Sequence, residues 1–214
     1  MHRTKRLGKL RRTLKKRLHR LEQRLTSIAP TTSTPDRDIV VAYVAIEALN
    51  AWAQFSRSFY LSCAIGAVTE RNRIITTTAP LTADHLGLAV AQYKKSAKPN
   101  AAGAWHRRDE PAWHDPNVLM TVCSNLGCSI QVAIQAAFSL QQNVFNDLPV
   151  CRNFFAHRNE ATSRAATNMA PRYALPTSLP PCDFLLAASP GNSTSVMLQW
   201  LDELNITAEF ICKS

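Results

Sequence analysis

The sequence predicts an all-α fold, a bundle of four to five helices that follows a basic N-terminal helix. Several long segments repeat apolar residues every three or four positions, which is the period of one helix face. The chain of 214 residues contains only 6 glycines and is 46% hydrophobic. That composition disfavours disorder and repeated tight turns. The length has room for one hydrophobic core with an appended segment.

The first predicted element is a helix over residues 1–28, and it holds the whole charge excess of the chain. The formal net charge is +10, and residues 1–24 contain 11 Lys and Arg against a single acid, Glu22. Residues 25–214 contain 14 basic and 14 acidic residues. Leucines at steps of three or four make an apolar stripe on the same helix, namely Leu7, Leu10, Leu14, Leu18, Leu21 and Leu25. The helix is therefore both basic and amphipathic.

Three interpretations of this basic helix stay open. A basic segment attracts polyanions through counterion release, so nucleic acid is the leading partner. The candidate contacts are Arg11, Arg12, Lys15, Lys16 and Arg17. A basic helix with an apolar stripe also suits an anionic membrane surface. In the third interpretation the leucines dock on the body of the protein.

A polar run bounded by prolines, residues 29–37, is predicted as a linker, and residues 38–214 as the helical domain. The domain opens with a long, mostly buried helix, because apolar residues from Val41 to Phe59 step by three and four. The longest apolar stretch, from Ile39 to Val68, is interrupted by Glu47, Asn50, Gln54 and Arg57. That stretch is too polar for a membrane-spanning helix, so a soluble protein is expected.

Further helices are expected along the domain. A short helix covers residues 82–95, and the apolar rhythm of residues 117–146 predicts one long helix. Asp147 as an N-cap and Pro149 in the first turn begin the next helix, which runs to about Met169. The last helix covers residues 194–204. Residues 101–117 and 174–194 are predicted as loops, with a strand-like run at Phe184–Ala187.

The six cysteines contain no C-x-x-C pair. No secretory signal is apparent, so the thiols are expected to be reduced core residues of a cytoplasmic protein. The Arg-rich start resembles a transit peptide but is taken as mature sequence.

One short stretch, PVCRNFFAHRNEA at residues 149–161, combines residue types that suit phosphate chemistry. Histidine titrates near neutrality, and arginine offers a bidentate fork to phosphate. The asparagine amide can hold the imidazole in one tautomer or bind a phosphate oxygen. Asn153 and His157 are four positions apart and share a helix face, whereas Arg152 and His157 lie about 140° apart around a regular helix. The two phenylalanines between them are expected to be buried.

The run Arg152-Asn153-x-x-x-His157, followed by Arg158-Asn159, resembles the R-x4-6-H signature of HEPN domains (higher eukaryotes and prokaryotes nucleotide-binding). That family is all-α, and many members are metal-independent ribonucleases of toxin–antitoxin, abortive-infection and other antiviral systems. The resemblance covers residues 38–214 by architecture and residues 152–159 by motif. The N-terminal helix lies outside it.

The resemblance implies a homodimeric endoribonuclease with no cofactor and no metal. Arg152, Asn153 and His157 take the catalytic positions, and Arg158 joins the nucleic-acid contacts. Family members commonly pair so that two motifs line one cleft, and an antitoxin or a larger effector protein is a possible partner. The alternative is a catalytically silent HEPN-like module that binds nucleic acid within a larger defence complex.

Other combinations of residues point to different chemistry more weakly. His106, His114, Cys123 and Cys128 include zinc-competent atoms, but their spacing does not match paired ligands of structural zinc sites. Two tryptophans, Trp105 and Trp113, lie beside Arg107 and Arg108, where they would stack on unpaired bases or insert into the core. Glu47 and Arg57 either reach the cleft or make ordinary surface contacts.

Overall fold

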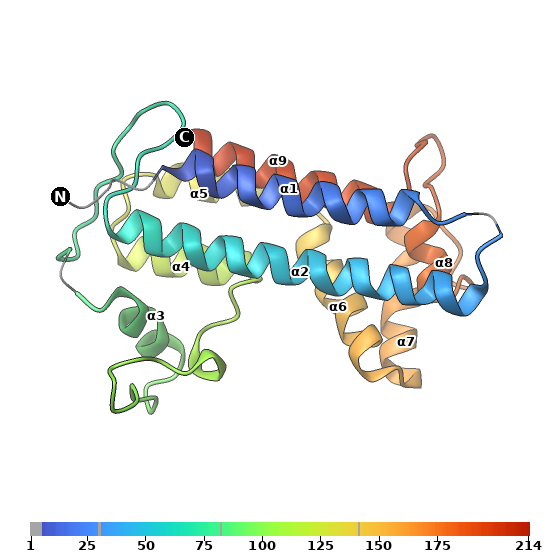
Figure 1. The fold of residues 1–214 in the computed structure, drawn as a ribbon, viewed down its shortest axis with the longest axis horizontal. Helices are drawn as coiled ribbons and strands as arrows, with labels where there is room; N and C mark the ends of the chain where they lie inside the picture. The colour runs from blue at the N-terminus through green and yellow to red at the C-terminus, as the bar shows by residue number, and fades with distance from the viewer. Residues whose placement is uncertain (1–5, 30, 82, 141) are drawn as a thin grey trace. The chain divides into compact units, whose positions relative to one another are not determined.

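A computed structural model describes residues 6–29, 31–81, 83–140 and 142–214, and helices dominate these ranges (Figure 1). The all-α prediction is confirmed. Over the same ranges the structure has nine α-helices instead of four to five, with two short 3-10 helices, η1 at Arg107–Asp109 and η2 at Ala170–Tyr173. The α-helices are α1 (Leu7–Thr26), α2 (Thr34–Ala64), α3 (His85–Tyr93), α4 (Pro116–Asn125), α5 (Gln131–Ser139), α6 (Val144–His157), α7 (Glu160–Thr167), α8 (Pro181–Leu186) and α9 (Val196–Lys213).

The chain divides into two compact units. The first contains Met1–Thr13, Trp52–Leu140 and Thr207–Ser214, and the second contains Leu14–Ala51 and Gln141–Ile206. The division follows contacts between segments, so the long helices α1, α2 and α9 each contribute residues to both units. Each unit is described by itself below.

Aromatic side chains of α2 form the centre of the first unit. The ring of Phe55 lies 5.3 Å from that of Trp52 and 6.0 Å from that of Phe59, measured between centroids. Tyr60 packs against Trp113 at 5.4 Å, and its hydroxyl donates a hydrogen bond to the backbone oxygen of His85 at 2.8 Å. The hydroxyl is thereby satisfied inside an apolar core, as a buried tyrosine requires.

Three aromatic rings form the centre of the second unit. Tyr173, Phe184 and Trp200 pack edge to face, with centroid separations from 5.4 to 6.2 Å. Phe184 belongs to α8, a helix where the sequence predicted a strand-like run, so that prediction is wrong. Pro181 at the start of α8 has the fixed φ that favours a first helical turn.

Helix α1 is docked by its leucine stripe. Leu7 is buried in the first unit, and Leu14, Leu18, Leu21 and Leu25 are buried in the second. Of the three interpretations of the basic helix, docking on the body is the one that burial supports. Helix α2 already begins at Thr34, inside the stretch predicted as a linker. Residues 1–5 and 30 of the predicted N-terminal segments, and residue 82 of the predicted helix 82–95, lie outside the described residues.

The predicted single helix over residues 117–146 is wrong, because the chain turns between α4 and α5. Gly127 has a φ of +62°, and the N–H of Cys128 bonds to the oxygen of Cys123 at 3.1 Å. A left-handed residue followed by this backbone bond is the Schellman motif that ends a helix. Residue 141 lies outside the described residues.

The predicted helix from Pro149 to Met169 is also wrong at both ends. Helix α6 begins at Val144, so that Asp147 and Pro149 lie within it, and it ends at His157. Helix α7 is a separate element. In contrast, the short helix near residues 82–95 is confirmed as α3, and the last helix extends beyond the predicted Leu204 to Lys213.

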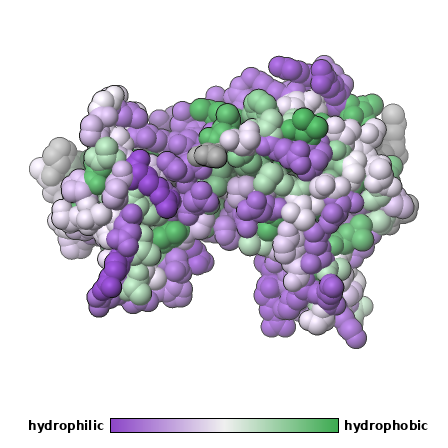
Figure 2. All heavy atoms as spheres, turned by 180° about the vertical axis from the view of Figure 1, so that it is seen from behind, coloured by the Kyte–Doolittle hydropathy of each residue, from purple (hydrophilic) through white to green (hydrophobic). Residues whose placement is uncertain are grey.

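The surface mixes polar and apolar side chains, and Figure 2 shows hydrophobic areas separated by hydrophilic ones. Large apolar side chains that are exposed include Ile39, Ile74, Leu81, Val132 and Leu140. Helix α2 is long and apolar enough to cross a membrane by length and composition, a criterion that the buried core helices of soluble proteins also meet. The structure buries 56% of its most apolar window.

Candidate functional site

Helix α6 carries the RNxxxH motif, and four apolar residues attach it to the second unit. Val144, Leu148, Cys151 and Phe155 are buried and step by four, three and four, so they share one face. Figure 1 shows α6 followed at once by α7. The motif therefore lies on a helix whose orientation is set by a continuous buried stripe.

A buried polar network fixes the first turns of α6. The carboxylate of Asp147 is 1% exposed, accepts a hydrogen bond from the Tyr173 hydroxyl at 2.8 Å, and forms an ion pair with Arg172. The indole N–H of Trp200 donates to the same Tyr173 oxygen at 2.8 Å. Burial raises the pKa of Asp147, against the opposing effects of Tyr173 and Arg172. Asp147 thus joins α6 to η2. The prediction that it caps the start of a helix is wrong.

A second carboxylate meets the start of α6. Glu203 of α9 accepts a hydrogen bond from the backbone N–H of Val144 at 3.1 Å. An acid at a helix N-terminus satisfies an otherwise unpaired N–H and complements the helix dipole. Burial raises the pKa of Glu203, while its hydrogen bond from Val144 opposes that rise.

The three predicted catalytic side chains lie on the exposed side of α6, with Asn153 and His157 on one face and Arg152 about 140° away from His157. Arg152, Asn153 and His157 are all exposed, and Phe155 behind them is buried. Ala156, also exposed, lies between Arg152 and His157 on the same strip. Within the described residues none of the three side chains makes a hydrogen bond or an ion pair, so a single chain does not hold them in a preformed polar constellation.

The chain turns sharply just after the predicted histidine. Arg158 has a φ of +45°, in the left-handed region, and its N–H bonds to the oxygen of Phe154 at 2.7 Å. Asn159 then caps α7 in a capping box with Thr162. A left-handed conformation costs a non-glycine residue about 1–2 kcal/mol, and such strain is common at functional positions. The side chain of Arg158 is exposed beside the motif.

A shallow hollow of about 670 Å³ adjoins this turn. It is lined by α7 and its flanks, namely Asn159, Glu160, Ala161, Arg164, Ala165 and Asn168. Arg164 forms an ion pair with Glu160 one turn away. The hollow is lined by both polar and small apolar side chains, and it begins at Asn159, the residue that follows Arg158.

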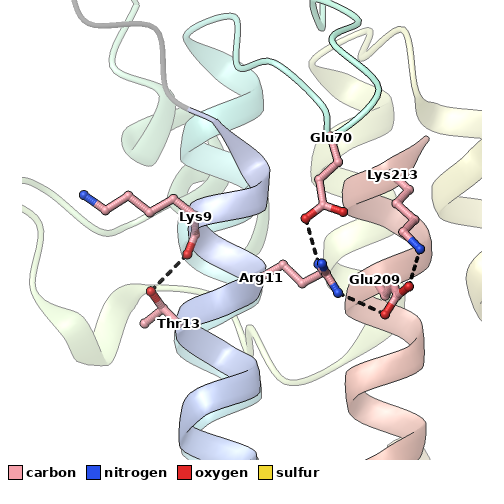
Figure 3. A network of polar contacts seen from close by, with 6 residues as sticks. All are labelled: Lys9, Arg11, Thr13, Glu70, Glu209 and Lys213. Carbon is pink, nitrogen blue, oxygen red and sulfur yellow. Dashed lines mark hydrogen bonds and ion pairs between the residues drawn. The ribbon is translucent and has the colours of Figure 1, made fainter.

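The predicted nucleic-acid contacts of α1 divide into two groups. Arg11 and Arg17 are half-buried and form intramolecular ion pairs, whereas Arg12, Lys15 and Lys16 are exposed. Arg11 donates to Glu70 at 2.7 Å and to Glu209 at 2.9 Å, and Lys213 pairs with the same Glu209 (Figure 3). The hydrogen bond from Arg11 to Glu70 raises the pKa of Arg11. Arg11 and Arg17 therefore already have carboxylate partners within the chain, whereas the other three cations have none among the described residues.

The other residues named from the sequence have structural contacts. Arg57 forms a two-pronged ion pair with Glu110, at 2.6 and 3.1 Å, and the Trp113 indole donates to the same carboxylate at 2.7 Å. Trp105 donates to Asp84 at 2.6 Å. Both tryptophans are thus tied to the protein's own carboxylates, and Glu47 pairs with Arg17.

The zinc hypothesis finds no assembled ligand set in the part of the chain that the structure describes. No group of three or more His, Cys, Asp or Glu side chains there is arranged to hold a metal ion. His106 is exposed on a loop, whereas Cys123 and Cys128 are buried.

Sequence reasoning missed two kinds of residue. Asp147 was seen only as a helix cap, and its partners Arg172, Tyr173 and Trp200 carried no local signal because they are far away in sequence. Lys9 and Arg20 were also overlooked, although their spacing opposite the leucine stripe is visible in the sequence.

Comparisons with known proteins returned no relative. No protein-family model matches the chain, and neither a curated protein nor a solved structure matches it significantly.

Proposed function

We propose that the chain is a metal-independent endoribonuclease of HEPN type that acts as a homodimer. The observation that carries the proposal is the exposed strip of α6, where Arg152, Asn153 and His157 point away from a firmly packed helix face and have no partner within the described residues. Polar side chains that are left unpaired on a rigid helix are available to an external ligand.

The chemistry follows from the side chains. His157 accepts the proton of a ribose 2′-hydroxyl, and that oxygen attacks the neighbouring phosphorus. Arg152 stabilises the charge that develops on the phosphorane oxygens, and Asn153 orients the imidazole or a phosphate oxygen. The P–O5′ bond breaks and the leaving oxygen takes up a proton. The products are a 2′,3′-cyclic phosphate and a 5′-hydroxyl end.

Pairing of two chains supplies the geometry that one helix does not. Arg152 and His157 lie about 140° apart around α6, so one chain presents them in different directions. In a two-fold dimer the same surface of both chains meets, and Arg152 of one copy is brought toward His157 of the other. The small, exposed Ala156 between them leaves room for close approach.

Cleavage of single-stranded RNA by the purified chain and its variants tests the proposal. Arg152→Ala and His157→Ala are each expected to abolish cleavage and leave the circular dichroism spectrum unchanged, because both side chains are exposed. Arg164→Ala is the matched control, since it removes an exposed arginine of α7 outside the motif. Loss of cleavage in the control alone, or full activity in His157→Ala, contradicts the assignment.

Mixing the two inactive variants tests whether the site is shared. If arginine and histidine come from different copies, the mixed dimer of Arg152→Ala and His157→Ala keeps one intact site. An equal mixture after subunit exchange then recovers about a quarter of the wild-type sites. If both groups act within one chain, the mixture stays inactive.

The second candidate is a nucleic-acid-binding module without catalysis, which assembles with an antitoxin or a larger effector in the cytoplasm. It is favoured by the absence of any hydrogen bond that joins the motif side chains within the described chain. Purified protein that binds RNA but never cuts it, with or without the motif substitutions, supports this candidate.

A further inference from the structure

Two groups of cations on α1 differ in what surrounds them. Helix geometry places the buried leucines on one side, at 100° per residue. Arg11, Arg17 and Arg24 lie on the flanks of that buried side. Arg11 and Arg17 form ion pairs, and the guanidinium of Arg24 lies 4.6 Å from the centroid of the Tyr43 ring. These three arginines hold the helix in place.

Four other cations form an outer ridge opposite the leucines. Lys9, Arg12, Lys16 and Arg20 step by three, four and four, so they occupy an arc of about 80° and a length of about 16 Å along the axis. All four are exposed, and their side chains make no ion pair within the described residues. Their mutual arrangement follows from one continuous helix. We use the term "outer ridge" for these four residues.

Figure 3 shows the division directly for two neighbours. The side chain of Arg11 reaches toward Glu70 and Glu209, whereas that of Lys9 extends to the other side of α1. No carboxylate of α1 offsets the outer ridge, because Glu22, the one acid of the helix, lies about 120° away from its centre and pairs with His19 at 3.1 Å. The ridge is thus a one-signed charge row.

We propose that the outer ridge of α1 binds a phosphodiester backbone without sequence preference, and the choice of RNA as that polymer rests on the proposed function. A row of four fixed cations at roughly regular spacing matches a polymer whose charges repeat, and release of condensed counterions supplies the free energy. Arginines of the ridge add bidentate hydrogen bonds to phosphate oxygens. The protein's whole charge excess lies in this N-terminal segment, so no other part of the chain competes for the polyanion by net charge.

Burial of the leucines argues against a membrane as the partner. A basic amphipathic helix binds bilayers by inserting its apolar face, but the apolar face of α1 is already packed against the protein. What remains exposed is charge without an apolar stripe. Such a surface suits a hydrophilic polyanion, and the binding it gives does not depend on whether the motif of α6 cleaves RNA.

The test measures binding of a fluorescein-labelled 2′-O-methyl RNA of about 20 nucleotides, which resists cleavage by 2′-hydroxyl attack. The ridge variant combines Lys9→Gln, Arg12→Gln, Lys16→Gln and Arg20→Gln, since glutamine keeps a similar helix propensity. The control combines Arg71→Gln, Arg73→Gln, Lys95→Gln and Lys98→Gln, which removes four exposed cations outside α1. Fluorescence anisotropy is recorded over a series of KCl concentrations.

The ridge variant is expected to bind about tenfold or more weakly, and the slope of log K against log[KCl] is expected to fall by about 3, as for four phosphate contacts to a single strand. The control variant should keep both affinity and slope. Equal binding by wild type and ridge variant, or an equal loss in the control, overturns the proposal. So does wild-type binding to phosphatidylserine vesicles without binding to RNA.

His157→Ala separates this proposal from the proposed ribonuclease. That variant keeps the outer ridge and is expected to bind the labelled RNA as the wild type does. If the wild type binds the labelled RNA through the ridge but does not cleave unmodified RNA, the ribonuclease proposal is contradicted and the ridge proposal is not. If the wild type cleaves RNA but the ridge variant binds RNA as well as the wild type does, the ridge proposal is contradicted and the ribonuclease proposal is not.

Discussion

The carboxyl group of Asp147 is buried, and its partners determine how the first turns of α6 are held. Tyr173 donates to it, and Trp200 donates to Tyr173, so three elements far apart in sequence meet at one oxygen network. Burial of a carboxylate without full compensation favours its neutral form, which is why the pKa of Asp147 is raised. The residue that anchors the motif helix is therefore also a titrating group.

Asp147→Asn is expected to change how stability depends on pH. Because the folded state raises the pKa above its unfolded value of about 3.9, the folded protein binds more protons than the unfolded chain between the two values. The free energy of unfolding therefore falls as pH rises through that window. Asparagine keeps an acceptor for Tyr173 but does not titrate. Urea unfolding from about pH 4 to about pH 8 should show a shallower fall in the variant.

Glu203 also contributes to the pH dependence of stability. Because burial raises its pKa as well, it too makes the free energy of unfolding fall as pH rises. Some slope is therefore expected to remain in Asp147→Asn. An identical slope in variant and wild type contradicts the assignment of the effect to Asp147.

At the scale of single elements, the end of α4 depends on a glycine. Gly127 is left-handed, and a Cβ built on it would lie 2.4 Å from the hydroxyl oxygen of Thr78. The same threonine is fixed by its backbone bond to the oxygen of Leu126 at 3.0 Å. The turn between α4 and α5 thus combines a conformational requirement with a steric one.

Gly127→Ala and Gly103→Ala separate these two requirements. Both glycines have positive φ, +62° and +75°, but a Cβ at Gly103 meets nothing within 4 Å. Gly103→Ala is expected to lower the free energy of unfolding by about 1 kcal/mol, the cost of the backbone conformation alone. Gly127→Ala should lower it by about 1–3 kcal/mol more, because Thr78 must move. Equal losses in urea unfolding would show that Thr78 yields freely.

The helices that sequence periodicity missed share one physical cause. The apolar rhythm continues through Gly127, and the predicted helix 149–169 runs through Arg158, yet at both points the backbone takes a left-handed residue that ends the helix. For Gly127 the signal was present, since glycine favours that position. Arg158 itself gave no such signal, because arginine rarely adopts a φ of +45°, although the next residue, Asn159, is of a type that favours a helix N-cap.

At the scale of the whole molecule, composition and period were sufficient for the fold class but not for the role of the N-terminal segment. The leucine stripe was visible, but its burial against the protein depends on residues far away in the sequence. The ion pairs of Arg11 with Glu70 and Glu209 are of the same long-range kind. Arg152, Asn153 and His157 lie on one helix, as their spacing predicted. The proposed ribonuclease site also requires a second copy, which one sequence does not describe.

The six cysteines report on the integrity of the whole chain. All are unpaired thiols and all are buried, at Cys63, Cys123, Cys128, Cys151, Cys182 and Cys212. Burial raises the pKa of Cys151 and Cys212, and that of Cys182 to about 12, so at neutral pH these thiols are protonated as well as shielded. Because a thiolate is the reactive form, both effects suppress the reaction of these three thiols. Cys128 differs, since hydrogen bonds from Cys123 and Cys63 lower its pKa to about 4, and burial alone shields it.

The folded protein is therefore expected to react with few or none of its six equivalents of a disulfide reagent such as dithionitrobenzoate, and with all 6 after denaturation. The cysteines belong to both compact units, so partial reaction under mild urea has a specific meaning. If Cys151 and Cys182 react before Cys63, Cys123 and Cys128, the second unit opens first. Simultaneous reaction of all six indicates one cooperative transition. Rapid reaction without denaturant contradicts the buried placement of the thiols.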